Sequence, residues 1–209
     1  RRGSRGWLKI QDGCDRKCSF CATRLARGES RSRPATEVLA EARLLAEVHP
    51  ELVLTGVHIG HYGRDLPGPG SLSGLLARLV DEVPGVRFRL GSIEATEVDD
   101  RLLDLLATRG NRVAPHLHMP LQSGSDRILM AMKRGHTVLE YKSKIRRLRK
   151  LRPNISISSD FIVGFPGETE DDFDQTLSLL REVAFDTVFS FKYNARPGAP
   201  AARLADDVP

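Results

Sequence analysis

Three cysteines, Cys14, Cys18 and Cys21, lie close together near the start of the chain. They are the only cysteines among 209 residues, and three and then two residues separate them. An odd number of thiols in one short segment argues against a disulfide framework and for a metal site in a reducing compartment. Three thiolates can hold a four-iron cluster and leave one iron open to bind a substrate.

Two other interpretations of the cysteines stay open at this point. A structural zinc ion takes four ligands, and the sequence places no fourth ligand beside the three thiols. His49, His58 and His61 are distant along the chain, although a fold could bring one of them close. The second alternative is a surface loop of unligated thiols. The spacing favours the iron-sulfur cluster over both.

Apolar, strand-like runs alternate with helical patterns along the chain, which is typical of strand-helix units around a parallel sheet. We expect six strands, at residues 7–11, 51–55, 86–93, 116–121, 155–163 and 187–193. Helices are expected from about Thr36, through the leucines of 72–80 and 102–106, from Asp126, and after the capping boxes Thr137/Glu140 and Thr169/Asp172. A closed eight-unit barrel takes about 250 residues. The sequence therefore predicts an α/β fold, a partial (β/α)6 TIM-like barrel with parallel strands.

Several candidate ligand contacts follow predicted strands, and ligands of such sheets bind where strands end. Gln122 and Ser123 either hydrogen-bond a cofactor or cap the next helix. Gly164 and Gly167 either let the backbone approach a ligand closely or simply form a βα turn. Glu94 either contacts a ligand or pairs with a nearby arginine. We expect these residues to share one face with the cysteines.

Composition and charge restrict the setting and the partners. The chain is 40% hydrophobic and 28% charged, which is ordinary for a soluble globular protein. No apolar run approaches the roughly 20 residues of a membrane helix, so we expect a cytoplasmic protein without a membrane partner. The net charge is +5, and basic residues gather within 1–33 and 142–152. Such clusters suit a polyanion, although they also occur on ordinary solvated surfaces.

The cysteine spacing, with Phe20 before the last thiol, resembles the radical S-adenosylmethionine (SAM) superfamily. The resemblance implies that the three cysteines hold a 4Fe-4S cluster whose open iron binds the amino and carboxylate groups of SAM. One electron then breaks the sulfonium to give a 5′-deoxyadenosyl radical, while the protein orients and shields the cofactor. The implied cofactor contacts are Phe20, Thr55, Gly56, Glu94, Gln122, Ser123, Gly164 and Gly167. Because Thr55-Gly56-Val57 stands where the superfamily often has Gly-Gly-Glu, only backbone contacts carry over there.

Longer segments resemble the methylthiotransferases of this superfamily, namely residues 9–14, 26–33, 120–126 and 160–168. These enzymes add sulfur and a methyl group at C2 of a modified adenosine beside the tRNA anticodon, or at an aspartate of a ribosomal protein. Residues 54–60 and 92–98 are most similar to the branch that acts on N6-threonylcarbamoyladenosine, which we therefore expect. Residues 189–193 and 196–198 are closer to the N6-isopentenyladenosine branch. An alternative of another class is a metal-stabilised RNA-binding module without catalysis.

The resemblance also implies a domain organisation and partners. Residues 1–195 form the radical SAM core, and residues 196–209 form a tail or a junction to an RNA-binding barrel. A domain with a second 4Fe-4S cluster precedes the core in this family and is absent from this chain. Implied partners are an electron donor such as flavodoxin or ferredoxin and a tRNA, bound by a monomer. The tRNA phosphates would be held by Arg24, Arg27, Arg31 and Arg33, unless these arginines pair with Glu29 and other acidic side chains.

Overall fold

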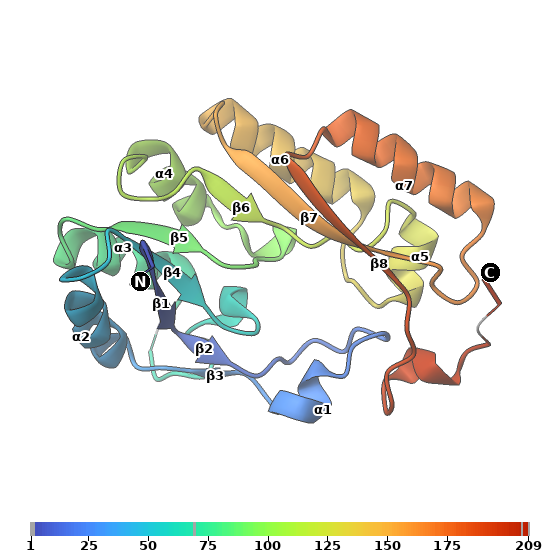
Figure 1. Ribbon diagram of the computed structural model, residues 1–209, viewed down its shortest axis with the longest axis horizontal. Helices are drawn as coiled ribbons and strands as arrows, with labels where there is room; N and C mark the ends of the chain where they lie inside the picture. Colours follow the sequence, from blue (N-terminus) through green and yellow to red (C-terminus); the bar gives the residue numbers. More distant parts are fainter. Residues whose placement is uncertain (1–2, 69, 206, 209) are drawn as a thin grey trace.

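Six parallel strands form one curved arc in the computed structural model, which describes residues 3–68, 70–205 and 207–208 (Figure 1). In spatial and chain order they are β1 (Arg5–Lys9), β4 (Glu51–Thr55), β5 (Arg87–Leu90), β6 (His116–His118), β7 (Ser156–Val163) and β8 (Thr187–Lys192). Isolated parallel bridges, including Ser92 to His118, join β5 to β6. The open, partial barrel expected from the sequence is confirmed. The ends of the expected core and tail, at 1–2, 206 and 209, lie outside the described residues.

Helices cover the outer side of the arc (Figure 1). They are α2 (Ala35–Ala46), α3 (Leu72–Glu82), α4 (Asp100–Thr108), α5 (Asp126–Ala131), α6 (Val138–Leu151) and α7 (Glu170–Val183). The described part of the chain contains no helix long and apolar enough to cross a membrane. The helices alternate with the strands, as the sequence predicts, and both expected capping boxes are present at the starts of α6 and α7.

The hydrophobic core lies between these helices and the sheet. Alternation along the strands sends one set of side chains to the helices and the other to the hollow of the arc. Leu8, Phe88 and Ile157 are fully buried on the helix side. Trp7, next to Leu8, is 66% exposed. The hollow side of the sheet is therefore accessible, and the carboxyl ends of the strands lead to the cysteine segment.

Some elements differ from the prediction. Strands β5 and β6 stop at Leu90 and His118, because the chain bends into loops that carry Glu94 and Gln122. The first predicted strand is split, since Gln11–Asp12 forms β2 and pairs antiparallel with β3 (Arg31–Ser32). Helix α1 (Thr23–Arg27) was not expected, and it buries none of its residues, so it leaves no apolar periodicity in the sequence. Single 3-10 turns occur at η1 (Ile59–His61), η2 (Ala95–Glu97) and η3 (Pro200–Arg203).

Asp172, in the first turn of α7, links the start of α7 to the start of α5 and gives a stability prediction. Its buried carboxylate accepts hydrogen bonds from Ser125 Oγ at 2.6 Å, from Thr169 N at 2.9 Å and from the Arg127 guanidinium. The Arg127 hydrogen bond is the main reason that the pKa of Asp172 lies well below its usual range. Replacement with asparagine is expected to lower the free energy of unfolding by about 2 kcal/mol at neutral pH, because an amide accepts these bonds poorly.

Urea unfolding at several pH values checks the sign of this effect. A carboxyl group with a depressed pKa stabilises the fold above its ordinary value, and that contribution is lost as pH falls through the lower, folded-state pKa. The stability difference between the wild type and D172N should therefore shrink as pH is lowered from about 5 to about 3. A difference that stays constant over this range would contradict the electrostatic origin.

Candidate active site around three cysteines

The cysteine segment is closed at its base by the short β2–β3 pair. Gly13, just before Cys14, has a φ of 73°, and a Cβ at this position would collide with the carbonyl oxygen of Glu29. The Cys14 amide donates a 3.0 Å hydrogen bond to Gly28 O. Because the two ends of the segment are held together in this way, the residues between them form a loop that turns back on itself. Only glycine fits at position 13.

All three cysteines line one cavity of about 320 Å³. All are free thiols; Cys18 is buried, and the other two are partly buried. Polar side chains from five other loops or strands also line it, namely His58, Glu94, Gln122, Arg134 and Asp160. The fold thus places three thiols at the carboxyl end of the sheet, as the sequence predicts, together with groups of both charges.

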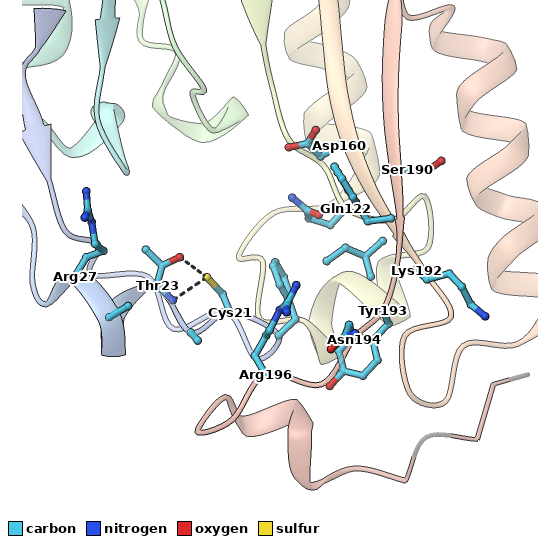
Figure 2. Close-up of a pocket in the computed structure, with 15 residues that line it drawn as sticks. Cys21, Thr23, Arg27, Gln122, Asp160, Ser190, Lys192, Tyr193, Asn194 and Arg196 are labelled. Carbon is cyan, nitrogen blue, oxygen red and sulfur yellow. Dashed lines mark hydrogen bonds between the residues drawn. The ribbon is translucent and has the colours of Figure 1, made fainter. Parts of the chain in front are cut away.

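A larger hollow of about 820 Å³ adjoins this cavity. The two share the lining residues Phe20, Cys21, Thr23, Gln122 and Asp160. Strand β8 contributes Phe191 and leads to Tyr193 and Arg196 on the same wall. Figure 2 shows Arg27 and Arg196 on opposite sides of Cys21, whereas the side chain of Lys192 extends away from it. The larger hollow therefore has aromatic and cationic groups beside one of the thiols.

Cys14 contacts a buried histidine. Its Sγ lies 3.6 Å from His58 Nδ1, and His58 Nε2 lies 2.7 Å from Glu97 Oε1. Burial alone opposes the charged imidazole, but the bonds to Cys14 and Glu97 prevail and raise the pKa of His58 to about 9. Burial by itself raises the pKa of the Cys14 thiol, but the hydrogen bond to His58, a backbone hydrogen bond from Arg16 and the charge of His58 together outweigh burial and lower it. These contacts favour the charged form of each group, namely a thiolate at Cys14, an imidazolium at His58 and a carboxylate at Glu97.

Cys18 contacts an arginine in a similar arrangement. Arg134 Nη1 lies 3.5 Å from Cys18 Sγ, and Arg134 Nη2 lies 2.5 Å from Glu94 Oε2. Burial raises the pKa of the Cys18 thiol, and the guanidinium opposes that rise. Of the two roles weighed for Glu94, pairing with an arginine is the one formed here, and its carboxylate also lines the cavity. Cys21 has an uncharged partner, since its Sγ lies 3.0 Å from Thr23 Oγ1 (Figure 2).

These residues fit an iron-sulfur cluster. Three thiols face one cavity, and each has a hydrogen-bonding side chain beside its sulfur. Thiolate ligands with hydrogen bonds to their sulfurs are the normal surroundings of such clusters. The fold also brings His58 to Cys14, so one histidine that could complete a zinc site is close, while His49 hydrogen-bonds Gly3 O instead. The geometry is compatible with an iron-sulfur cluster and, with His58 as a fourth ligand, with zinc.

Among the other expected cofactor contacts, Phe20 and Gln122 line the cavity, as does Glu94. Gln122 has an unusual φ of 87°, held by backbone bonds from Gln122 N to Asp160 O and from Ile162 N to Gln122 O. Such a strained residue at a cavity is typical of a functional site. Ser123 is fully buried and accepts a hydrogen bond from the Ser125 amide, and Ser125 is the residue that caps α5.

The glycine contacts lie beside the cavity rather than on its lining. After β4, the residues that line the cavity wall are Val57 and His58. Gly56, which follows Thr55, packs against β2 instead, since a Cβ at this position would lie 2.7 Å from Gln11 O. Gly164 and Gly167 have φ values of 71° and 77° in the turn after β7. Their amides donate to the carboxylates of Glu168 and Asp207. The turn interpretation accounts for their backbone conformation.

The four arginines expected to bind tRNA are in different surroundings. Arg27 lines the larger hollow and also pairs with Asp12 at 3.1 Å. Arg24 pairs with Glu29 at 3.1 Å, which is the alternative raised from the sequence. Arg33 bonds Glu41 of α2 at 2.5 Å and Lys9 O at 2.7 Å. Arg31 is exposed and donates to Arg27 O. The structure thus brings one of the four to a cavity wall.

Several residues of the site were not singled out from the sequence, chiefly Arg134, Asp160, Glu97 and Arg196. Arg134 lies three residues after the end of α5, in a segment without a recognisable motif. Asp160 and Glu97 lie inside segments of recognisable resemblance, and the position of Asp160 near the end of a strand is a signal that could have identified it. Arg196 lies in the region assigned to the tail. Arg134, Glu97 and Asp160 share hydrogen bonds to loops distant in sequence.

Comparison with known proteins identifies the class. The family model of the Radical SAM superfamily matches residues 8–180. The chain belongs to the radical SAM superfamily. Membership identifies a 4Fe-4S cluster and SAM as its cofactors, which favours iron over structural zinc in the cysteine loop.

Within that superfamily the chain is 48% identical to the tRNA-2-methylthio-N(6)-dimethylallyladenosine synthases of Ralstonia pickettii (strain 12J) and Francisella tularensis subsp. novicida (strain U112). The matches cover 99% of this chain and 46% and 47% of those proteins. The chain therefore spans slightly less than half the length of these relatives.

Solved structures share the fold at low sequence identity. One is the radical SAM methyltransferase TsrM from Kitasatospora setae, solved with cobalamin and a [4Fe-4S] cluster bound. It superposes with a TM-score of 0.77 at 17% sequence identity, and the match covers 94% of this chain and 38% of the TsrM chain. Coproporphyrinogen III oxidase (HemN) from Escherichia coli has a TM-score of 0.69 at 18% identity, over 97% of this chain and 48% of its own. These likenesses confirm the partial barrel.

Proposed function

We propose that this chain is the radical core of a transferase that methylthiolates tRNA at N6-dimethylallyladenosine, the isopentenyl-type substrate. The observation that carries the proposal is the convergence of Cys14, Cys18 and Cys21 on one cavity, in a chain whose 48% identical relatives bear that name. The threonylcarbamoyl branch, expected from residues 54–60 and 92–98, gains no support from these relatives. The alternative indicated by residues 189–193 and 196–198 fits them better.

Each group around the smaller cavity has a proposed task. Cys14, Cys18 and Cys21 hold the 4Fe-4S cluster, which when bound supplies the electron for cleavage of SAM. The mixed charges of Arg134, Glu94 and Asp160 suit a ligand that carries a carboxylate, an ammonium and ribose hydroxyls. Phe20 lies between the two cavities and limits access of water to the reacting atoms.

The larger hollow is the proposed position of the tRNA base. Ile162, Phe191 and Tyr193 offer apolar and aromatic surface on which an adenine with a dimethylallyl group can stack. Arg27 and Arg196 flank Cys21 and can hold neighbouring phosphates. The base would then lie beside the cavity where SAM is cleaved.

The remaining parts of the proposal concern the longer protein. We propose that residues 1–195 act as the radical core and residues 196–209 as a junction, within a monomer whose further domains provide a second 4Fe-4S cluster and an RNA-binding barrel. Flavodoxin or ferredoxin is the proposed type of electron donor. The length of the relatives, about twice that of this chain, supports the additional domains.

Mass spectrometry of tRNA nucleosides after deletion of the gene tests the substrate. The proposal expects the 2-methylthio form of N6-dimethylallyladenosine to disappear and its unmethylthiolated precursor to accumulate. Loss of the threonylcarbamoyl counterpart instead would overturn the choice of branch. Unchanged tRNA nucleosides would contradict a tRNA substrate and favour a protein aspartate.

Arg27 and Arg33 provide a matched pair for the tRNA contact. Arg27→Gln is expected to weaken tRNA binding roughly tenfold near 0.1 M salt and to reduce the slope of log affinity against log salt by about one, the effect of one lost phosphate contact. Arg33→Gln should leave both unchanged, because Arg33 is bound to Glu41. Fluorescence anisotropy over a range of salt concentrations measures both quantities. Equal losses in the two variants would contradict the assigned position of the tRNA.

A further inference from the structure

The histidine beside Cys14 belongs to a buried polar group that the proposed reaction does not use. His58 and His61 follow β4, Glu97 ends η2, and Arg16 comes from the cysteine loop. Glu97 Oε1 lies 2.7 Å from His58 Nε2, 3.1 Å from His61 Nε2 and 3.2 Å from Arg16 Nη2. The Glu97 side chain is only 3% exposed, and that of His58 is 7% exposed. Four side chains from three loops thus meet directly behind Cys14.

This group is built as a hydrogen-bond network rather than as a second metal site. Ligand atoms of His58, His61 and Glu97 do lie within 4.8 Å of one another, close enough to share an ion. However, Arg16 already presents a positive charge to the same carboxylate oxygen. A second cation there would face that guanidinium at close range, which is unfavourable in a buried setting. Glu97 Oε1 is instead shared among hydrogen-bond donors.

The direction of the bonds to His58 follows from what its neighbours can accept. An ionised carboxylate only accepts hydrogen bonds, so Nε2 donates to Glu97. A thiolate that ligates iron also only accepts, so Nδ1, 3.6 Å from Cys14 Sγ, donates as well. An imidazole that donates from both nitrogens is positively charged. Glu97 therefore both orients the ring and balances its charge.

We propose that His58 is a positioning residue for the cluster: its charged imidazole, fixed by Glu97, donates a hydrogen bond to Cys14 Sγ and raises the reduction potential of the cluster. The inference rests on the proposed role of Cys14 as a cluster ligand. Hydrogen bonds and positive charge at cluster sulfurs stabilise the reduced state, in which the cluster carries one more negative charge. The side chain beside Cys21 Sγ is instead the neutral Thr23.

Replacement of His58 by leucine, in the full chain reconstituted anaerobically, tests the inference through the midpoint potential of the cluster. Redox titration followed by electron paramagnetic resonance gives the potential, and iron and sulfide assays give the loading. The variant is expected to load the cluster, because it retains all three thiols. Its equilibrium constant for reduction should fall about tenfold, which for one electron is a downward shift of about 59 mV.

Two further variants separate the hydrogen bond from general packing. His61→Leu removes a ring that contacts Glu97 and lies 3.8 Å from the His58 ring between centroids, and because the bonds of His58 to Cys14 and Glu97 remain, it should keep the wild-type potential. His58→Gln keeps a donor near the sulfur without the charge, and it should recover part of the shift. A fully loaded H58L variant with an unchanged potential would overturn the inference. If H58L fails to load, H58Q decides, and a wild-type potential in H58Q would overturn it.

The same titration distinguishes failure of this inference from failure of the proposed function. Wild-type protein that forms no cluster would overturn both. Wild-type protein with a cluster, together with unchanged potentials in the His58 variants, would overturn the role of His58 alone. Loss or retention of tRNA methylthiolation does not enter this readout, because the potential is measured without substrate.

Discussion

Cys18→Ala is expected to lower the iron content of the anaerobically reconstituted protein from about four atoms per chain to less than about one. Cys18 is the buried member of the three cysteines, and its loop position is fixed by backbone bonds from Ser19 N to Met132 O and from Cys21 N to Cys18 O. Two thiolates cannot hold a four-iron cube that already has one open iron. Iron and sulfide assays, with the visible absorption of the cluster, measure the loss.

The matched control for this variant is Ser19→Ala in the same loop. Ser19 is buried and donates a 2.7 Å hydrogen bond to Ala131 O, so its loss perturbs the loop without removing a thiol. We expect S19A to retain the full cluster and to lose only about 1 kcal/mol of stability. A C18A protein that still bound four irons would show that the thiol is not a ligand. An S19A protein that lost them equally would show that disturbance of the loop alone accounts for the loss.

Gly13→Ala is expected to have the second largest effect, on both stability and cluster assembly. A side chain here must adopt a φ of 73° and its Cβ would collide with the carbonyl of Glu29, a backbone atom that cannot turn away. Strain of this kind lowers the free energy of unfolding by about 3 kcal/mol. Because Gly13 precedes Cys14, the variant should also load far less iron. Urea unfolding and iron assays measure the two effects.

Gly85→Ala separates the collision from the backbone strain. Gly85 has a φ of 79°, similar to that of Gly13, but a Cβ there would meet no atom within 4 Å. It lies between α3 and β5, away from the cysteines, and its replacement should cost about 1 kcal/mol and leave the iron content unchanged. Equal destabilisation of G13A and G85A would contradict the tight closure of the cysteine loop.

The alternation of strands and helices was predictable because each of these elements depends on a local pattern. The leucines of α3 recur with helical spacing and are buried, and the capping boxes at Thr137 and Thr169 mark the starts of α6 and α7. The β2–β3 pair was not predictable in this way. It contains two residues on each side, and Gln11 and Asp12 find their partners only after the cysteine loop has closed.

The candidate site was predictable to a similar degree. The thiols carry their own signature in their spacing, and Phe20 and Gln122 lie in segments that resemble the family. Arg134 carries none, since it reaches Cys18 from a distant loop, and the resembling segment that includes Glu97 does not reveal that its carboxylate bonds His58. For the arginines near the cysteines the sequence predicted too much, because their charge and their proximity in sequence suggest one tRNA-binding role for all four. In the fold, Arg27 faces a cavity and Arg33 faces α2.

Cys14, Cys18 and Cys21 form the proposed site of SAM cleavage. Incubation of the anaerobically reconstituted chain with SAM and a strong reductant, followed by quantification of 5′-deoxyadenosine by mass spectrometry, tests this role. We expect 5′-deoxyadenosine to accumulate with the wild type and to remain at background with C18A. A chain that carries its full complement of iron yet releases no 5′-deoxyadenosine would contradict this role of the three cysteines, and so would a C18A variant that releases it at the wild-type rate.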